Sequence, residues 1–501
     1  MIRTIKPSPF MAHVLFTTGA SMATIGANIF VLRFLAEGFG VEKFGVYSLA
    51  GRLTTFLQPF STLALGTALS RFVSLSTAVR ARREYLLGGF LLGIVPNLFI
   101  VTGGVLLSGP LTQLIFHDGR HQTLFFMTLF WVAAFFFYSI LDGFYFGCGE
   151  IRKANLWQIF LGSIGPLFIA LSFSRRGNVD WVVFLFGTLY FTSLVPLIIH
   201  LFPAVMTKPA WTRIRPRIKE LGSYALPRFP VRFVLAALFS LAPFLAPYFG
   251  SLQDAGFLMV GLMVFRIAEL GSTALGRVLL PKAGELFSEG RQEYLKERIE
   301  DIVTFVFYTG LFVTLRWILW SDQIILVWLG RPFAEAIPLM RILILAVAPY
   351  LLFVMLSPIV DAIEEKPINL KHLLLSFLVA LLSSGVAGKV FSKIGLAFGT
   401  VLGLTTLGFL TLFYLRKVYG INFKSLQVKK ILLGNLALLS AGLLLKNGLT
   451  ARWEGIRLMG AGIIGEGLFL SLYLFLLWKL QPRWIGELEK RLFPVSQGKQ
   501  I

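Results

Sequence analysis

Charged residues are scarce in this chain of 501 residues. They form 14% of the sequence and hydrophobic residues 56%, whereas a soluble domain has about 25% charged and about 45–50% apolar residues. A soluble fold would have too little charge to cover so large an apolar core. The mean hydropathy of +0.77 indicates lipid as the main solvent. Despite a net charge of +22, the composition is unlike that of a nucleic-acid-binding domain, which clusters Lys and Arg on a polar surface.

Cysteine and histidine are scarce as well. The single cysteine, Cys148, excludes a disulfide within the chain and a cysteine-based metal site. Among five histidines, His117 and His121 form a close pair at i, i+4 spacing. A metal ion needs more ligands than this pair offers, and the sequence places none nearby, so we interpret the pair as solvated loop residues. We expect no metal ion and no cofactor.

The N-terminal stretch shares two features with a secretory signal. Arg3 and Lys6 precede an apolar run that starts near Phe10. However, this run continues to about Val31, and no small-residue cleavage site stands out. We therefore interpret it as a retained first membrane helix.

Long apolar runs recur along the whole chain. Runs of about 20 mainly apolar residues predict about fourteen transmembrane helices. The predicted spans cover 13–33, 45–70, 86–108, 122–146, 155–173, 181–205, 224–249, 254–280, 301–320, 338–361, 370–390, 394–416, 431–445 and 456–479. The longest connections, 206–222 and 282–300, leave no room for a folded extramembrane domain. We predict an all-α polytopic membrane protein.

Basic residues in the loops predict the orientation, because Lys and Arg stay preferentially on the cytoplasmic side. With the N-terminus inside, the even-numbered loops and both termini carry about three times as many basic residues as the odd-numbered loops. These loops include Arg80, Arg82, Arg83, Arg152, Lys153, Lys208, Arg213, Arg215, Arg217, Lys219, Lys366, Lys371, Arg416 and Lys417. This bias predicts a multi-pass protein with both termini cytoplasmic. Specific binding of lipid headgroups is the alternative role for these residues.

The two halves of the chain resemble each other. Residues 39–50 and 249–260 both contain Phe-Gly, a short polar turn, and then Gly and an aromatic residue. Residues 150–155 and 364–369 form a second pair, from Glu to Asn, at a similar offset. Generic loop chemistry is the alternative source of so weak a repeat. A parallel repeat predicts two six-helix bundles with a cavity between them.

The repeat also predicts how the chain is divided. We expect an N-terminal lobe of spans one to six, a C-terminal lobe of spans seven to twelve, and an appendage of spans thirteen and fourteen with a basic tail. The corresponding residues are 1–205, 206–416 and 417–501.

Four arginines lie inside predicted spans, where charge is costly and marks a functional site by default. Arg52 lies roughly 10 Å into span two, at 1.5 Å per residue. Arg228 and Arg232 project from one face of span seven, and no acid lies at helical spacing from them. Arg266 lies near the middle of span eight. We predict that all four bind an anionic substrate in the cavity, since the planar guanidinium suits phosphate.

Three acids are candidates for coupling transport to an ion gradient. Glu269 stands at i, i+3 from Arg266, a spacing that also allows an ion pair neutralising both charges. Asp142 and Asp361 lie near the cytoplasmic ends of spans four and ten. Local ion pairs or hydrogen bonds at the helix ends are the alternative role for these two.

Further arginines lie nearer the ends of spans. Arg33 and Arg316 are candidate gate or secondary cations near the outer ends of spans one and nine. Arg71, Arg277 and Arg341 lie near helix ends, where their side chains can extend to the interface, and we interpret them as structural.

Several motifs, taken in order, resemble a known family. Residues 31–35 (Val-Leu-Arg-Phe-Leu), 39–50 and 65–73 resemble the opening of the polysaccharide and O-antigen flippases. Residues 147–155 resemble the cytoplasmic turn of this family after span four, and 393–400 resemble its Gly-rich start of span twelve. These flippases belong to the multidrug/oligosaccharidyl-lipid/polysaccharide (MOP) exporter superfamily.

This resemblance implies a fold and a function. It implies two six-helix lobes around a cavity that alternates between the membrane faces, and movement of an isoprenoid-pyrophosphate-linked oligosaccharide across the inner (cytoplasmic) membrane of a bacterium. It implies a role in making lipopolysaccharide O-antigen or other cell-surface polysaccharide, with cavity arginines on the pyrophosphate. Arg33 and Arg71 fall on recognisable motif positions of the family. Expected partners are the lipid-linked oligosaccharide, membrane lipids and polysaccharide assembly enzymes, with the protein acting as a monomer.

Two other classes of protein remain as alternatives. A multidrug or other small-molecule exporter of the same fold would need an acidic cavity for cationic drugs, whereas these spans are basic. A membrane polysaccharide polymerase or glycosyltransferase would need a long outer loop or paired acids at the membrane face. Glu364 and Glu365 form an adjacent acid pair at a span boundary, and the orientation places them inside. We therefore expect a transporter and not an enzyme.

Overall fold

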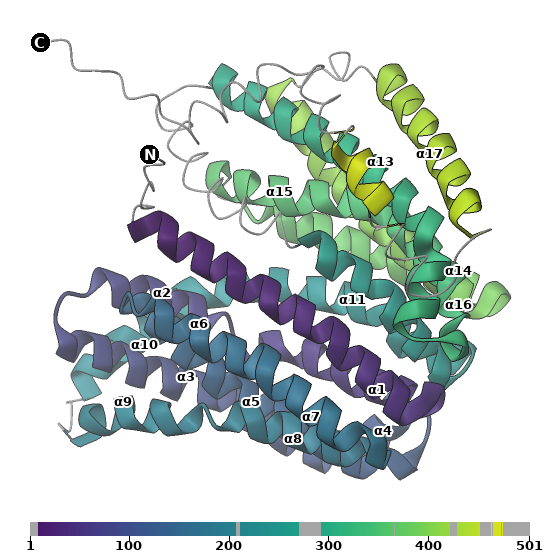
Figure 1. Cartoon of the computed structure of the whole chain (residues 1–501). Helices are drawn as coiled ribbons and strands as arrows, with labels where there is room; N and C mark the ends of the chain where they lie inside the picture. The colour runs from purple at the N-terminus through teal and green to yellow at the C-terminus, as the bar shows by residue number, and fades with distance from the viewer. Residues whose placement is uncertain are drawn as a thin grey trace, which may run out of the picture.

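The described part of the chain is helical throughout. The structure is a computed structural model that describes residues 9–206, 211–269, 292–364, 366–420, 428–450, 462, 464–471 and 473, and no strand occurs in these ranges (Figure 1). Nine stretches within them are long and apolar enough to cross a membrane, and two of these contain two predicted spans each. The predicted all-α membrane fold is confirmed.

The first half of the chain forms predicted spans one to six. Its main helices are α1 (Pro9–Thr62), α2 (Leu65–Leu75), α3 (Val79–Leu106), α4 (Ser108–Phe116), α5 (Gln122–Gly147), α6 (Ile151–Ile159), α7 (Gly165–Phe173), α8 (Val179–Phe191) and α9 (Leu194–Met206). Spans one and two join into α1 across a kink at Gly40, whose φ of 70° favours glycine. A π-helical segment, Phe160–Ile164, links α6 to α7 within span five.

The second half continues with α10 (Trp211–Ala225), a 3-10 turn η4 (Leu226–Arg228), α11 (Phe229–Phe249), α13 (Gln292–Trp328), α14 (Ala336–Leu343), α15 (Val347–Ile363), α16 (Ile368–Tyr419) and α17 (Val428–Thr450). Residues 252–269 are also helical. Spans eleven and twelve join into α16 across a kink at Ser392 (φ 51°). The end of span eight and most of span fourteen lie outside the described residues.

Both long predicted connections contain helix. Residues from Gln292 onward extend span nine into the 37-residue helix α13. Helix α10 occupies most of 206–222 and packs on α2 and α3 of the first half (Figure 1). The carboxylate of Glu84 lies 4.0 Å from Arg217 of α10, and Tyr85 donates a hydrogen bond to Glu220. Ile214 and Leu221 of α10 are buried and Arg213 and Arg215 are exposed, a periodic pattern that a count of consecutive apolar residues does not detect.

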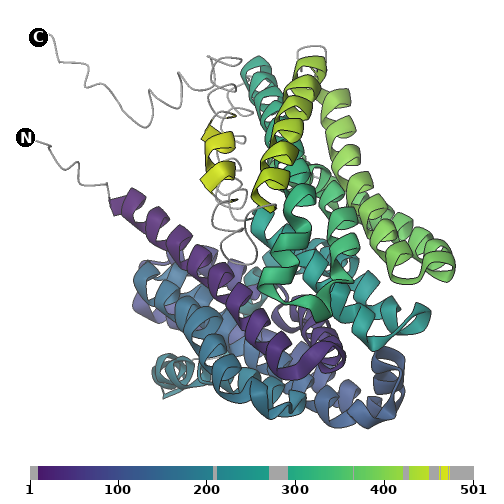
Figure 2. The ribbon, with the colours of Figure 1, turned by 45° about the vertical axis from the view of Figure 1, so that its right-hand side comes forward.

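Helices of the two halves lie on either side of a shared core. The helices of the second half from α11 onward lie on the other side of α1 from the first half in two views (Figures 1 and 2), whereas α10 lies beside α2 and α3. The second part of α1 packs along α11, and the indole nitrogen of Trp328 donates to the carbonyl of Ile29, 2.9 Å away. The largest cluster of buried apolar side chains contains residues of both halves.

Turns of both halves meet at one end of the molecule, which we call the sealed end. It is formed by residues 40–45, 174–178, 250–254, 330–335 and 392–393. Lys43 Nζ donates to the carbonyl of Gly177 at 2.9 Å. Lys393 Nζ lies 2.8 Å from the carboxylate of Asp254 and also bonds Glu335. Three turns that are distant in sequence are joined by this one ammonium group.

Two glycines make the closest approach between the halves at the sealed end. A Cβ atom on Gly45 would lie 2.0 Å from the carbonyl oxygen of Leu252, and one on Gly256 would lie 3.1 Å from the Cα of Gly45. These glycines occupy corresponding positions of the sequence repeat. Beside them, the rings of Phe44 and Phe333 pack edge to face at 5.3 Å. The starts of two repeat-related helices therefore meet here with no space for a side chain.

Basic residues gather at the other end, which we call the basic end. It comprises the turns at 76–78 and 148–150 together with α10. Arg82 Nε donates to the carbonyl of Ser76 at 2.8 Å, and Lys153 pairs with Glu150 at 2.8 Å.

Candidate functional site

A cavity of about 230 Å³ lies between α1 of the first half and three helices of the second half. Its wall is formed by α1, α11, the helix at 252–269 and Tyr350 of α15. Three of the four predicted cavity cations, Arg52, Arg232 and Arg266, line it together with Glu269. The residues that line this cavity therefore carry net positive charge.

Arg52 is the most deeply buried of these cations, with 7% of its surface exposed. Its Nε atom is buried and has no hydrogen-bond partner among the described residues. Nearby hydroxyl groups donate to their own helix instead: Thr54 to the carbonyl of Ala50 and Thr55 to that of Gly51. Arg266 is close enough to repel the charge of Arg52. Two cations thus share one wall, and one buried donor is unsatisfied.

Arg232 lies at the side of the cavity toward the basic end. Its Nη2 donates to Thr67 Oγ1 on α2 at 3.0 Å, which links the two halves. A threonine hydroxyl leaves the guanidinium charge uncompensated, so this contact orients Arg232 without neutralising it.

Glu269 is the one acid among the lining residues. It accepts a hydrogen bond from the hydroxyl of Tyr350, which is 1% exposed. Edge-to-face contacts with Phe239 and Phe265, at 5.2 and 5.6 Å, fix the ring of Tyr350. Aromatic packing therefore holds the position of the phenol that bonds this acid.

Arg228, the fourth predicted cation, does not line the cavity. It lies one helical turn from Arg232, toward the basic end, in the turn η4. Its Nη1 donates to the carbonyl of Tyr224 at 2.8 Å, and its guanidinium carbon lies 3.7 Å from the centre of the Tyr224 ring. Pro227 and Pro230 flank it and break the helix at this point.

The other predicted residues lie elsewhere. Arg33 pairs with Glu37 at 3.0 Å on an exposed face of α1. Asp142 is half-buried on α5, away from the cavity wall. Asp361 is exposed at the end of α15 and accepts a hydrogen bond from Asn369 at 2.7 Å. The structure does not bring these residues to the cavity.

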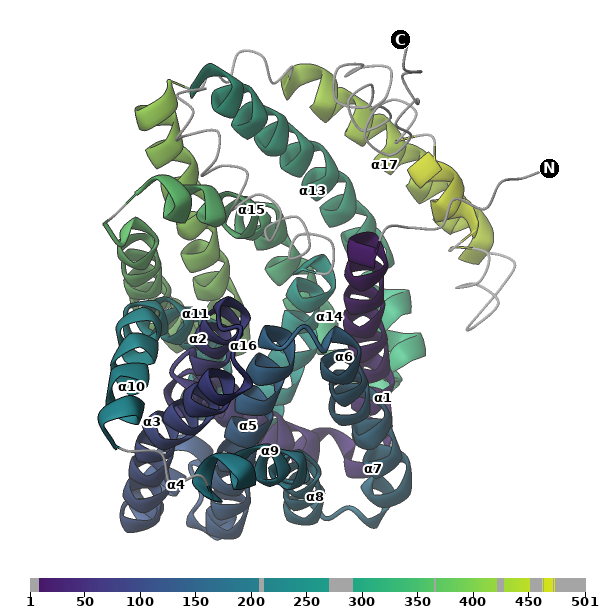
Figure 3. The ribbon, with the colours of Figure 1, turned by 90° about the vertical axis from the view of Figure 1, so that its left-hand side faces the viewer.

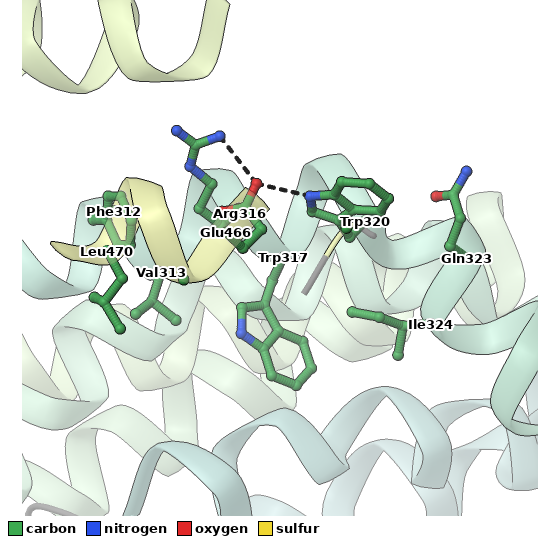
Figure 4. A pocket seen from close by; sticks show the side chains of 11 residues that line it. Phe312, Val313, Arg316, Trp317, Trp320, Gln323, Ile324, Glu466 and Leu470 are labelled. Atoms are coloured by element: carbon green, nitrogen blue, oxygen red, sulfur yellow. Dashed lines mark hydrogen bonds and ion pairs between the residues drawn. The ribbon is translucent and has the colours of Figure 1, made fainter. Parts of the chain in front are cut away.

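Arg316 lies beside a different pocket, about 520 Å³ in volume, between α13 and residues 462–470. Its Nη1 lies 3.2 Å from the carboxylate of Glu466, and its Nη2 donates to the carbonyl of Leu438 at 2.5 Å. The indole of Trp320 donates to the same carboxylate at 2.9 Å. Figure 4 shows Arg316 and Trp320 both directed at Glu466. Arg316 is thus in contact with two C-terminal segments.

Glycine at 442 makes the Arg316 contact possible. A Cβ atom there would lie 1.9 Å from Arg316 Nη1. The rest of the pocket wall is mainly apolar, with Phe312, Val313 and Ile324 on α13. The charge pair therefore lies at one side of an apolar pocket.

Sequence reasoning missed three residues that complete these sites. These residues are Tyr350, Tyr224 and Glu466. Each of them contacts a partner that lies on another helix or in a turn. Glu466 had a signal, since it is a single acid in an apolar run. The tyrosines had none, because a tyrosine in a membrane span is common. Among the described residues, no group of three or more His, Cys, Asp or Glu could hold a metal ion.

No family model matches the sequence, and no curated protein matches it either. Solved structures do match. The lipid II flippase MurJ, in an inward closed conformation, superposes with a TM-score of 0.75 at 14% identity, over 94% of this chain and all of that one. The chain has the MOP transporter fold.

Two transporters support the same assignment of the fold. An inward-facing multidrug resistance MATE family transporter of the MOP superfamily matches with a TM-score of 0.66 at 14% identity, over 81% of this chain and 98% of that one. The eukaryotic MATE transporter AtDTX14 matches with a TM-score of 0.58 at 12% identity, over 84% and 97%. Identities this low establish the shared fold alone, and the names of these neighbours are those of a flippase and of transporters.

Proposed function

We propose that this chain is a flippase for an isoprenoid-pyrophosphate-linked oligosaccharide that serves cell-surface polysaccharide biosynthesis, such as that of O-antigen. The observation that carries the proposal is the buried Arg52, whose Nε has no hydrogen-bond partner among the described residues and whose neighbour is a second cation, Arg266. A buried guanidinium without a counter-charge is costly, and a bound anion lowers that cost. The MOP fold supports a transport role for such a site.

A pyrophosphate fits the donors of this wall. Arginine presents parallel N–H groups that match phosphate oxygens two at a time. Arg52, Arg232 and Arg266 come from three helices, so one pyrophosphate bound among them would be held from several directions. The oligosaccharide would occupy the cavity, and the isoprenoid chain would stay in the bilayer.

Alternating access is the proposed transport mechanism. The positive-inside bias assigns the basic end to the cytoplasm, with both termini on that side of an inner membrane. The contact of Gly45 with Leu252 and Gly256 and the Lys393 bridge close the opposite end. Release to the outer face would require these contacts to separate, as a rigid movement of one lobe against the other.

Glu269 is the proposed coupling acid, because it is the one acid in the cavity wall. Protonation or cation binding at Glu269 would change the net charge next to Arg266 and so alter the affinity for the pyrophosphate. Asp142 and Asp361 lie away from the wall and are secondary candidates. We propose that the protein acts as a monomer in contact with membrane lipids and polysaccharide assembly enzymes.

Complementation of a flippase-deficient strain tests this function. We expect Arg52→Gln and Arg266→Gln to abolish surface polysaccharide at normal membrane expression. Arg33→Gln, which changes an exposed paired arginine, is the matched control and should complement fully. Full complementation by both cavity variants would refute the arginine mechanism.

Export of a small molecule is a second candidate, favoured by the MATE neighbours. The net positive wall disfavours cationic drugs and leaves organic anions as cargo. Efflux of an anionic dye from cells that express the chain would support this alternative. Accumulation of lipid-linked sugars on deletion, without a change in dye efflux, would support the flippase.

A further inference from the structure

A pair of arginines lies around one tyrosine ring at the basic end of the cavity. Arg71 on α2 belongs to the first half, and Arg228 in η4 belongs to the second. Their guanidinium carbons lie 4.8 and 3.7 Å from the centre of the Tyr224 ring. Figure 3 shows α2, α10 and α11 as neighbours in this region. Tyr224 therefore brings together one cation from each half.

Both arginines are exposed, and they outnumber the acidic residues near them. No ion pair joins Arg71 or Arg228 to an acidic residue in the part of the chain that the structure describes. Asp361 is near enough to interact electrostatically with Arg228, and its carboxylate accepts a hydrogen bond from Asn369. One partly engaged acid faces two cations, so the local charge is positive.

The ring contact leaves the donors of both guanidinium groups available. A cation–π contact uses the face of the guanidinium, whereas phosphate is bound by the N–H groups at its edge. Arg228 commits one N–H to the carbonyl of Tyr224 and retains the others. Phe72 packs edge to face against Tyr224 at 5.8 Å and fixes the ring. The site thus holds its arginines in place and leaves their outer edges for a ligand.

This pair continues into the cavity wall. Arg71 and Thr67 are one turn apart on α2, and Arg228 and Arg232 are one turn apart on the facing segment. The two residues of each pair are therefore about 6 Å apart along the helix axis. Because Arg232 bonds Thr67, the two turns run side by side from the exposed pair to the cavity. Cations therefore follow one another from the basic end to Arg52.

We propose that Arg71 and Arg228, held by Tyr224, form a mouth site that binds the phosphate groups of the substrate before they reach Arg52 and Arg266. The inference rests on the proposed function and adds Arg71 and Tyr224 as binding residues. At the mouth site, charge attraction captures the anion. Arg232 then provides the next pair of donors. Arg52 and Arg266, which we call the deep site, receive the pyrophosphate.

Binding kinetics separate the mouth site from the deep site. The full chain in lipid nanodiscs would be mixed with farnesyl pyrophosphate, and association and dissociation rates measured over a range of salt concentrations. For Arg71→Gln we expect both rates to fall about tenfold, because a steering and relay site acts on rates. The dissociation constant should stay within about twofold, since the deep site is unchanged. Tyr224→Leu should change the two rates in the same way. It replaces Arg71→Gln in the test if that variant does not fold.

The deep-site variant gives the opposite pattern and keeps the two proposals distinguishable. Arg52→Gln should raise the dissociation constant at least tenfold, and Arg33→Gln should match the wild type. Wild-type rates in both Arg71→Gln and Tyr224→Leu, with weakened equilibrium binding in Arg52→Gln, would overturn the mouth site and leave the flippase proposal standing. Equal dissociation constants for wild type and Arg52→Gln would overturn the flippase proposal itself.

Discussion

Arg52 and Arg316 are buried to the same degree and have opposite surroundings. Their exposed fractions are 7% and 6%. Arg316 bonds the carboxylate of Glu466 and the carbonyl of Leu438. Within the part of the chain that the structure describes, Arg52 Nε has no hydrogen-bond partner, and a second arginine lies nearby. The comparison shows that burial alone does not separate a structural arginine from a candidate binding arginine, whereas their hydrogen-bond and charge partners differ.

The physical basis of the difference is the cost of a buried charge. A charge that is paired and hydrogen-bonded contributes to structure, and removing one member leaves the other uncompensated. A buried charge that lacks a partner destabilises the empty state and favours any anion that can reach it. Arg316 therefore joins α13 to the C-terminal segments, whereas Arg52 is the residue proposed to bind the anionic ligand.

The largest effect on stability should come from Arg316→Gln. Loss of one member of a buried pair typically costs about 3–5 kcal/mol, and Glu466 would be left without its cation. We expect a large fall in the melting temperature of the purified protein in detergent. Glu466→Gln should lower it as well, and the double variant should be less destabilised than the sum of the single ones. Additive effects would show that the pair is not coupled.

The next largest effect should be on ligand binding, from Arg52→Gln. Two charge-assisted hydrogen bonds are worth about 3 kcal/mol together, which corresponds to about a hundredfold weaker binding of the pyrophosphate. The melting temperature without ligand should stay equal or rise, because an unpartnered charge is removed. Calorimetry with farnesyl pyrophosphate and a thermal scan measure both quantities. A fall in stability without a change in affinity would make Arg52 a structural residue like Arg316.

A smaller effect should follow from Gly256→Ala at the sealed end. The added Cβ would press on Gly45 at 3.1 Å, and overpacking of this kind costs about 1–3 kcal/mol. We expect the sealed state to be disfavoured, so that residues 250–254 become more accessible to a membrane-impermeant thiol reagent in a Ser251→Cys background. Gly51→Ala is the control, because no atom lies within 4 Å of a Cβ there. Equal labelling of the two variants would show that the glycine contact does not seal this end.

The smallest effect should come from Arg33→Gln. Arg33 and Glu37 form an exposed pair on one helix, and such pairs contribute about 0.3–0.5 kcal/mol. We expect wild-type melting temperature, pyrophosphate affinity and polysaccharide production. Loss of transport in this variant would make Arg33 the gate residue that its place near the outer end of span one suggested.

The sequence predicted the helices better than their joins. Apolar runs located the spans because membrane burial needs about 20 apolar residues whatever the neighbours. The kinks at Gly40 and Ser392 were not predicted, since a single left-handed residue can bend a helix without interrupting its apolar pattern. Helix α10 was predicted as a connection, because its apolar residues lie on one face and not in a run.

For the site, the depth of an arginine along its span predicted whether it lines the cavity. The sequence did not predict which residues are its partners. Arg52, Arg232 and Arg266 line one cavity, as their depth and the repeat suggested, while Arg228 lies one turn outside it. Glu466 stands 150 positions from Arg316 in the sequence, so no helical spacing could connect them. Tyr224 and Tyr350 gain their roles from aromatic contacts that form only in the fold.

Flipping of a fluorescent isoprenyl-pyrophosphate-linked sugar in proteoliposomes tests the central claim most directly. The wild type should move the lipid between leaflets, Arg52→Gln should do so about a hundredfold more slowly, and Arg316→Gln should retain the wild-type rate per folded molecule below its melting temperature. Equal rates for wild type and Arg52→Gln, at equal amounts of folded protein, would contradict the account.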